Sequence, residues 1–162
     1  MIPLRVEILH LYTSPAHNYF GHHGQAPGEY PMFEVDSIEC VAGHGISGDR
    51  FFDYRESYKG QITFFSSEVY AQLCKALDVH DKPPSSVRRN VITRGVDLNT
   101  LIETEFELQG VRFRGTEECR PCYWMDQAFG PGAERFLKGQ GGLRAIILTD
   151  GNLRVDGVAA NG

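Results

Sequence analysis

The sequence lacks any apolar run long enough to cross a membrane. Its longest such stretches, as in Ala145-Ile146-Ile147-Leu148, are only a few residues long, whereas a spanning helix needs about 20. The first seven residues carry charges within their apolar pattern, which is not typical of a secretory signal. We therefore expect a cytoplasmic protein with no membrane partner, and a first strand at its N-terminus.

Positive charge is also not in excess. The chain has 16 lysines and arginines against 21 acidic residues, and its formal net charge is -5 at pH 7. Proteins that bind DNA without sequence preference need a basic surface, because neutralising phosphates releases counterions. We therefore expect no nucleic acid partner.

Cysteine is scarce, with four in 162 residues. A chain of this size, with 41% hydrophobic residues, can build a core without disulfides, so free thiols are expected. Cys40 and Cys74 stand alone in apolar contexts, which is typical of small buried hydrophobes. Cys119 and Cys122 instead form a Cys-Arg-Pro-Cys segment beside Trp124, the only tryptophan. This segment is the leading site candidate.

The hydrophobic pattern predicts a mostly β protein with one domain over residues 1–162. Short runs with alternating or β-branched residues predict strands, and they lie near residues 6–11, 33–41, 60–65 and 90–93. Many short strands with two or three short helices favour a β-barrel-like fold.

Local signals define the helices and two hairpins. Ser66 or Ser67 can cap a helix over about 66–77, and a shorter helix is expected within 130–139 because Pro131 comes early and Gly139 late. Gln109-Gly110 predicts a hairpin turn, and Asp150-Gly151 predicts a closing hairpin between residues 143–148 and 153–155.

Arg120 lies between the two thiols of the Cys-Arg-Pro-Cys segment. A cation favours the thiolate, which is the form that attacks sulfur or ligates a metal, whereas Glu117 and Glu118 oppose this effect. The pair therefore suits a reactive sulfur or a metal ligand.

Three other interpretations of this pair stay open. A structural zinc site needs a second pair of ligands beside the two cysteines. The sequence offers only loosely spaced candidates for that pair, Cys40 with His44 or the adjacent His22 and His23. We therefore expect no zinc. A thioredoxin-type redox pair would precede a long helix in an α/β fold. Two inert, packed thiols are disfavoured by the Arg-Pro between them.

A glycine-rich segment, Gly43 to Arg50, is a second candidate. Its glycines let the backbone approach a ligand closely. Arg50 offers a planar fork for a phosphate or a pterin carbonyl, and Asp49 can hold that fork or bond pterin N–H groups. The alternative is a connector with a surface ion pair.

Two further clusters carry polar side chains. Arg89 and Asn90, after Arg88, stand at the entry to a predicted strand and can clamp a phosphate, although paired arginines are often a solvated face. His17, His22 and His23 fall in one predicted loop and suit metal binding or proton transfer, or are merely exposed.

The order of these clusters resembles that of the MOSC family, domains related to the C-terminal part of molybdenum cofactor sulfurases. The residues that carry the resemblance are Gly48-Asp49-Arg50, Gln61-Ile62-Thr63, Glu68, Arg89-Asn90-Val91, Gly95 to Asn99, Cys119 to Cys122, Gly130-Pro131-Gly132 and Gly141 to Arg144.

The resemblance implies a cysteine that carries a persulfide or ligates molybdenum in the pterin cofactor. Cys122 best matches the Pro-Cys of small stand-alone bacterial members and would be the metal ligand, and Cys119 is the second candidate. Arg50, Arg89 and Asn90 would then correspond to positions that contact the pterin and its phosphate. Asp49 and Arg120 are further candidate cofactor contacts because of their own chemistry. The sequence lacks the Cys-x-x-Thr pattern of larger members.

The expected function is thus sulfur transfer or molybdenum-dependent redox chemistry at a reactive cysteine. A cysteine desulfurase would serve as sulfur donor, and the family also carries an association with pyridoxal phosphate. The alternatives are a non-catalytic module that binds a pterin or anion, and a thiol-disulfide switch between the two cysteines.

Overall fold

Two β-sheets and a group of short helices make up the computed structural model, which describes residues 2–15 and 31–157. The strands are β1 (Ile2–Pro3), β2 (Glu7–Thr13), β3 (Phe33–Val35), β4 (Ser37–Val41), β5 (Gly45–Ile46), β6 (Ile62–Ser66), β7 (Val91–Arg94), β8 (Glu105–Leu108), β9 (Val111–Glu118), β10 (Leu143–Ile147) and β11 (Gly151–Arg154). The α-helices are α1 (Ser67–Leu77), α2 (Trp124–Ala128) and α3 (Ala133–Leu137), and the 3-10 helices are η1 (Pro84–Val87) and η2 (Leu98–Leu101).

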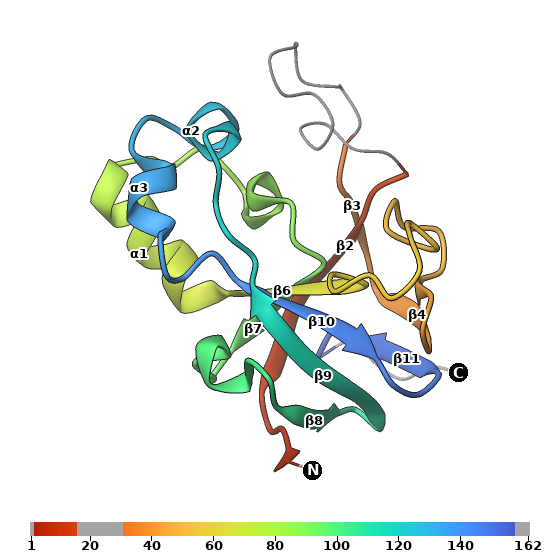
Figure 1. Cartoon of the computed structure of the whole chain (residues 1–162). Helices are drawn as coiled ribbons and strands as arrows, with labels where there is room; N and C mark the ends of the chain where they lie inside the picture. Colours follow the sequence, from red (N-terminus) through yellow and green to blue (C-terminus); the bar gives the residue numbers. More distant parts are fainter. Residues whose placement is uncertain (1, 16–30, 158–162) are drawn as a thin grey trace.

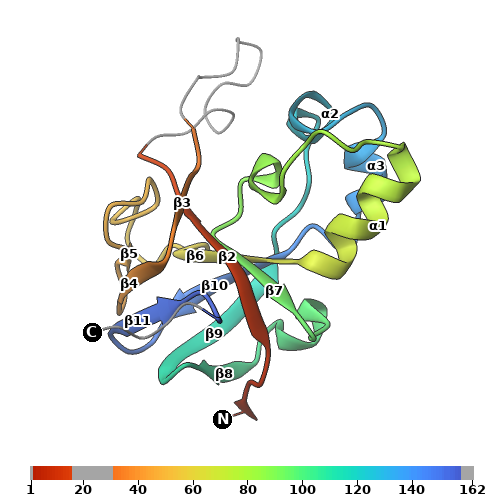
Figure 2. The same cartoon turned by 180° about the vertical axis from the view of Figure 1, so that it is seen from behind.

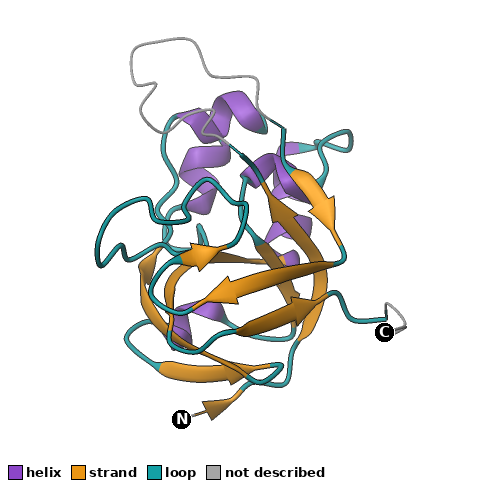
Figure 3. Cartoon of the chain, turned by 90° about the vertical axis from the view of Figure 1, so that its right-hand side faces the viewer, coloured by secondary structure: helices purple, strands orange, loops and turns teal. Residues whose placement is uncertain are grey.

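The larger sheet has the strand order β1-β8-β9-β10-β6-β7-β2-β3, and the smaller has the order β11-β4-β5. The mostly β prediction is confirmed. The expected barrel is only loosely matched, because the strands form two sheets that do not close on each other. All three α-helices lie at one side of the strands (Figures 1, 2 and 3). No helix in the described ranges is long and apolar enough to span a bilayer.

The local signals placed several elements correctly. Helix α1 begins after Ser66, whose hydroxyl oxygen accepts from the Val69 N–H at 3.2 Å, and ends at Asp78 in a left-handed conformation. Strands β8 and β9 form the expected hairpin, with positive φ at both Gln109 and Gly110. Positive φ at both central positions is typical of the tight hairpin turn.

The closing hairpin predicted from Asp150-Gly151 is wrong. Strand β10 pairs with β6 and β9, whereas β11 pairs with β4, with Gly151 opposite Cys40. The two strands therefore belong to different sheets, and residues 148–150 cross between them.

Buried residues form two clusters that position the cysteine segment. One lies inside the sheets and is rich in leucine and isoleucine, and its three phenylalanines, Phe64, Phe106 and Phe113, are in mutual ring contact. The other joins the three α-helices to the sheet through residues such as Leu73 and Phe129. The segment from the end of β9 to α2 connects the sheets to the helices (Figure 1).

Candidate functional site

The two thiols of the Cys-Arg-Pro-Cys segment lie in different surroundings. Cys119 follows β9 and is only 7% exposed; its N–H donates to the Gly142 carbonyl at 2.8 Å, which extends the β9–β10 pairing. Cys122 is half-buried and precedes α2, where its carbonyl accepts from the Met125 N–H at 2.9 Å. Arg120 between them is exposed. Both thiols are free.

Two arginines and a tyrosine are electrostatic neighbours of the Cys119 side chain. Burial works to lower the pKa of Arg144, but the neighbouring Cys119, Tyr58 and Glu117 side chains, including a hydrogen bond with Cys119, raise it overall. Burial lowers the pKa of Arg50, while the charges of Asp49 and Cys119 oppose that shift. Burial also raises the pKa of Tyr58, the Arg144 charge opposes that rise, and Cys119 is a smaller influence on the same hydroxyl. The Cys119 sulfur is thus the common neighbour of these groups.

Strand register explains why Arg144 meets Cys119. Arg144 lies opposite Glu117 in the β9–β10 pairing, and side chains two residues apart on a strand share a face. Arg144 Nη1 lies 3.3 Å from a Glu117 carboxylate oxygen. Gly60 lies close to both Tyr58 and Arg144, since a Cβ there would come within 3.3 Å of the Tyr58 ring and 3.4 Å of Arg144 Cδ.

Arg89 is tied to the protein's own backbone. Its guanidinium donates to the carbonyls of Val87, Gly141 and Cys119, at 2.8, 3.1 and 3.2 Å, and the residue is buried. These contacts join the end of η1, the segment before β10 and the cysteine segment. A phosphate would reach this fork only in competition with the carbonyls.

Asn90 is fully buried beside β6 and β2. Its side-chain oxygen accepts from both the N–H and the hydroxyl of Thr63, each at 3.0 Å, and its amide group donates to the Tyr12 carbonyl at 3.1 Å. The side chain therefore stabilises the junction of these strands.

The carboxylate of Asp49 is likewise engaged inside the protein. It accepts from the Ser14 N–H at 3.0 Å and from Arg50 Nη1 at 3.2 Å. Arg50 Nη2 donates to the Arg88 carbonyl at 3.1 Å, and its side chain is 5% exposed. The Asp49–Arg50 pair is thus buried rather than the surface ion pair considered as an alternative.

Glycines before β10 allow the close approach of the cysteine segment. A Cβ at Gly141 would overlap the Cys119 carbonyl oxygen and lie 2.8 Å from Pro121 Cδ. At Gly142, where φ is +111°, a Cβ would overlap the Phe64 carbonyl oxygen. These two positions therefore fix the distance between the segment and β10.

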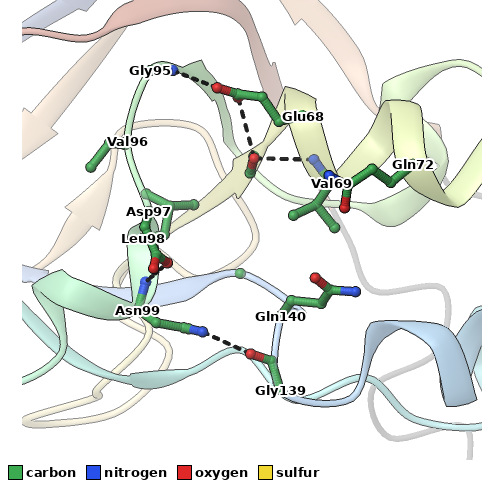
Figure 4. Close-up of a pocket in the computed structure, with 12 residues that line it drawn as sticks. Glu68, Val69, Gln72, Gly95, Val96, Asp97, Leu98, Asn99, Gly139 and Gln140 are labelled. Carbon is green, nitrogen blue, oxygen red and sulfur yellow. Dashed lines mark hydrogen bonds between the residues drawn. The ribbon is translucent and has the colours of Figure 1, made fainter.

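A pocket of about 530 Å³ is lined in part by this glycine segment. Its lining comes from the first turns of α1, the β7–η2 connection and the segment before β10. Figure 4 shows Glu68 accepting from the Gly95 N–H and Asn99 donating to the Gly139 carbonyl. No lysine, arginine or cysteine is among its lining residues, so this pocket does not contain the sequence-predicted site.

The remaining candidates lie apart from Cys119 or outside the described residues. His17, His22 and His23 fall within 16–30, which the structure does not describe. Cys40 is fully buried, and burial together with the nearby Glu39 charge raises its pKa to about 12. Within residues 2–15 and 31–157, no three His, Cys, Asp or Glu side chains gather as a metal-binding group.

Residue-level reasoning from the sequence missed the roles of Arg144 and Tyr58. Arg144 belonged to one of the motifs that carry the family resemblance, but no role was assigned to it. Tyr58 lies in a loop region without a recognisable pattern. Only the strand register and the packing above Gly60 bring both to the cysteine.

The described residues only partly suit a molybdenum-pterin group. A thiolate such as that of Cys122 is a soft ligand. However, Asp49, Arg89 and Asn90, which the sequence indicates as candidate cofactor contacts, bond to the protein itself. As arranged, these three residues do not fit the group.

Comparison with known proteins agrees with this architecture. A family model described as the MOSC domain matches residues 22–158. Among solved structures, the YUAD protein from Bacillus subtilis is similar with a TM-score of 0.73 and 18% identity, covering 93% of this chain and 91% of that one. YiiM from Escherichia coli gives 0.66 and 15%, covering 95% and 67%, and YiiM from Geobacillus stearothermophilus gives 0.66 and 9%, covering 93% and 71%. No curated protein matches significantly.

Proposed function

Because the chain belongs to the MOSC domain family, we propose that it is a sulfur carrier in which a cysteine of the Cys119–Cys122 segment holds a persulfide. The family is associated with molybdenum cofactor binding and with sulfurase-like functions. The observation that supports sulfur transfer is the Cys119 side chain, which is nearly buried and hydrogen-bonded to Arg144, with Arg50 and Tyr58 nearby.

Such surroundings suit a sulfur anion. A thiolate is the attacking form of cysteine, and neighbouring cations favour it. Partial burial strengthens the attraction, because interactions between charges weaken in high dielectric. A persulfide anion carries the same charge, so the same guanidinium groups stabilise the empty and the loaded carrier.

The transfer step needs no external oxidant. The carrier thiolate attacks the outer sulfur of a donor persulfide, of the kind that a cysteine desulfurase forms. A sulfur–sulfur bond forms on the carrier, the donor's sulfur–sulfur bond breaks, and the donor cysteine leaves as a thiolate. The proton of the donor persulfide remains on the transferred sulfur, so atoms and electrons balance.

The two cysteines have different merits as carrier. Cys122, the first choice from the sequence, is the more open of the two. Cys119 has the cationic surroundings. We assign the held sulfur to Cys119.

Mass spectrometry after treatment with a cysteine desulfurase and free cysteine tests this proposal. Both cysteines fall on one tryptic peptide, because trypsin does not cut Arg120–Pro121, so single variants must identify the carrier. We expect a persulfide in the wild type, in Cys122→Ser and in the control Cys74→Ser, but not in Cys119→Ser. An unloaded wild-type protein overturns the proposal.

The same samples separate the alternatives. Molybdenum retained by protein expressed with molybdate, without any persulfide, would favour cofactor binding. A Cys119–Cys122 disulfide formed in glutathione buffer, again without persulfide, would favour the thiol-disulfide switch.

A further inference from the structure

We propose that Arg144 is a positioning residue that holds the Cys119 sulfur, and that Glu117 limits this effect by sharing the same guanidinium. The inference rests on the proposed sulfur-carrier function and deepens it, because it names the group that orients the sulfur and the group that opposes it.

Geometry carries the inference. Arg144 and Glu117 are direct partners across β9 and β10, and their charged groups lie 3.3 Å apart. Cys119 is two residues beyond Glu117 on the same face, and its N–H bond to Gly142 fixes its position along β10. One guanidinium therefore contacts the Glu117 carboxylate and is also a neighbour of the Cys119 sulfur.

The other charged and titratable groups near the sulfur are differently occupied. The Arg89 guanidinium bonds three carbonyls, including that of Cys119. Arg50 is held by Asp49 and by the Arg88 carbonyl. Tyr58, on the segment before β6, is a neutral hydroxyl whose pKa is raised, chiefly by burial. Arg144, by contrast, bonds the Cys119 side chain itself.

This arrangement makes two substitutions act in opposite directions. Arg144→Gln removes the positive charge and the guanidinium contact, so the Cys119 thiolate loses stabilisation. Glu117→Gln removes a negative charge that competes for Arg144 and that itself disfavours a nearby anion. A general loosening of the β9–β10 pairing would instead change both variants in one direction.

The experiment measures the rate of iodoacetamide alkylation at Cys119 at pH 7, in a Cys122→Ser background that removes the neighbouring thiol. We expect Arg144→Gln to react about tenfold more slowly, because the thiolate, which is the reacting form, loses its neighbouring cation. We expect Glu117→Gln to react about two- to threefold faster, as is typical of a partly exposed charge pair. Arg144→Lys should recover part of the rate, because it restores charge without the planar fork.

Arg112→Gln is the matched control, since Arg112 is an exposed arginine elsewhere on β9. It should leave the rate unchanged. Cys74, measured in the same digest, reports loosening of the fold. Equal rates in Arg144→Gln and Arg112→Gln overturn the inference, as does a parallel rise at Cys74 in the Arg144 or Glu117 variants.

Failure of this inference is distinguishable from failure of the proposed function. If the wild type forms no persulfide but the alkylation rates change as expected, sulfur transfer is wrong and Arg144 still positions the thiolate. If the persulfide forms but Arg144→Gln alkylates like the control, the carrier stands and the role of Arg144 is wrong.

Discussion

An Arg89→Met variant should lose about 3–5 kcal/mol of unfolding free energy. The guanidinium donates three hydrogen bonds to buried or half-buried carbonyls, and bonds to charged groups contribute about 1.5–3 kcal/mol each. A simple sum, about 4.5–9 kcal/mol, is too large because methionine packs well in irregular space and neighbouring contributions do not add. Leaving one buried carbonyl without its donor costs about 1–3 kcal/mol, so three such groups that partly relax give a loss of about 3–5 kcal/mol.

Urea unfolding measures this loss from the transition midpoint and slope. The control is Arg112→Met on the exposed face of β9, which should stay within about 0.5 kcal/mol of wild type. Arg89→Lys should recover little, because a single ammonium group cannot match the planar fork that reaches three carbonyls. A loss below about 1 kcal/mol in Arg89→Met would refute the reasoning and return Arg89 to the role of a ligand contact.

Three further outcomes are expected. Gly141→Ala should lower the free energy of unfolding in urea by about 3 kcal/mol, because the new Cβ would overlap the Cys119 carbonyl. The control Gly43→Ala has positive φ but open space around it, and it should cost about 1–2 kcal/mol. Equal losses in the two variants would contradict the clash at Gly141. Burial works to raise the pKa of Glu68, but N–H and hydroxyl donors from Gly95, Ser66 and Ser67 lower it overall. The ionised Glu68 side chain therefore stabilises the fold above its ordinary pKa of 4.5. This stabilisation is lost as the pH falls through the lowered pKa of the folded protein. The stability gap between wild type and Glu68→Gln should therefore narrow between pH 7 and pH 3, and a constant gap would count against this account. Burial and the Glu39 charge raise the pKa of Cys40 to about 12. Cys40 should therefore resist alkylation by iodoacetamide at pH 7 in the native protein. Labelling of Cys40 as fast as that of Cys122 would disprove its burial.

Elements with local signals were predictable from the sequence. Helix α1 has its cap at Ser66 and an apolar face that includes Leu73, all within one short window. The β8–β9 turn is encoded by two adjacent residues, Gln109 and Gly110. In both cases the interacting residues are close in sequence, so the pattern alone determines the structure.

Pairings between distant segments were not predictable in this way. Asp150-Gly151 has the composition of a hairpin turn, yet Gly151 lies opposite Cys40, more than 100 residues earlier. Alternation indicates that a segment is a strand, but it does not identify the neighbouring strand. The predicted closing hairpin was wrong for this reason.

The candidate site shows the same division. The sequence identified the cysteine segment and the family from residue types and order. Arg89 has the chemistry of a phosphate contact, but its fork closes on carbonyls from three distant segments. The contact between Arg144 and Cys119 depends on the β9–β10 register, which no short motif encodes.

Sulfur transfer to Cys119 has a direct readout in the mass of the tryptic peptide that carries both cysteines, after treatment with a cysteine desulfurase and free cysteine. We expect a gain of one sulfur atom that dithiothreitol removes and that Cys119→Ser abolishes. An unchanged mass in wild-type protein, under conditions in which the desulfurase is itself persulfidated, would contradict sulfur transfer.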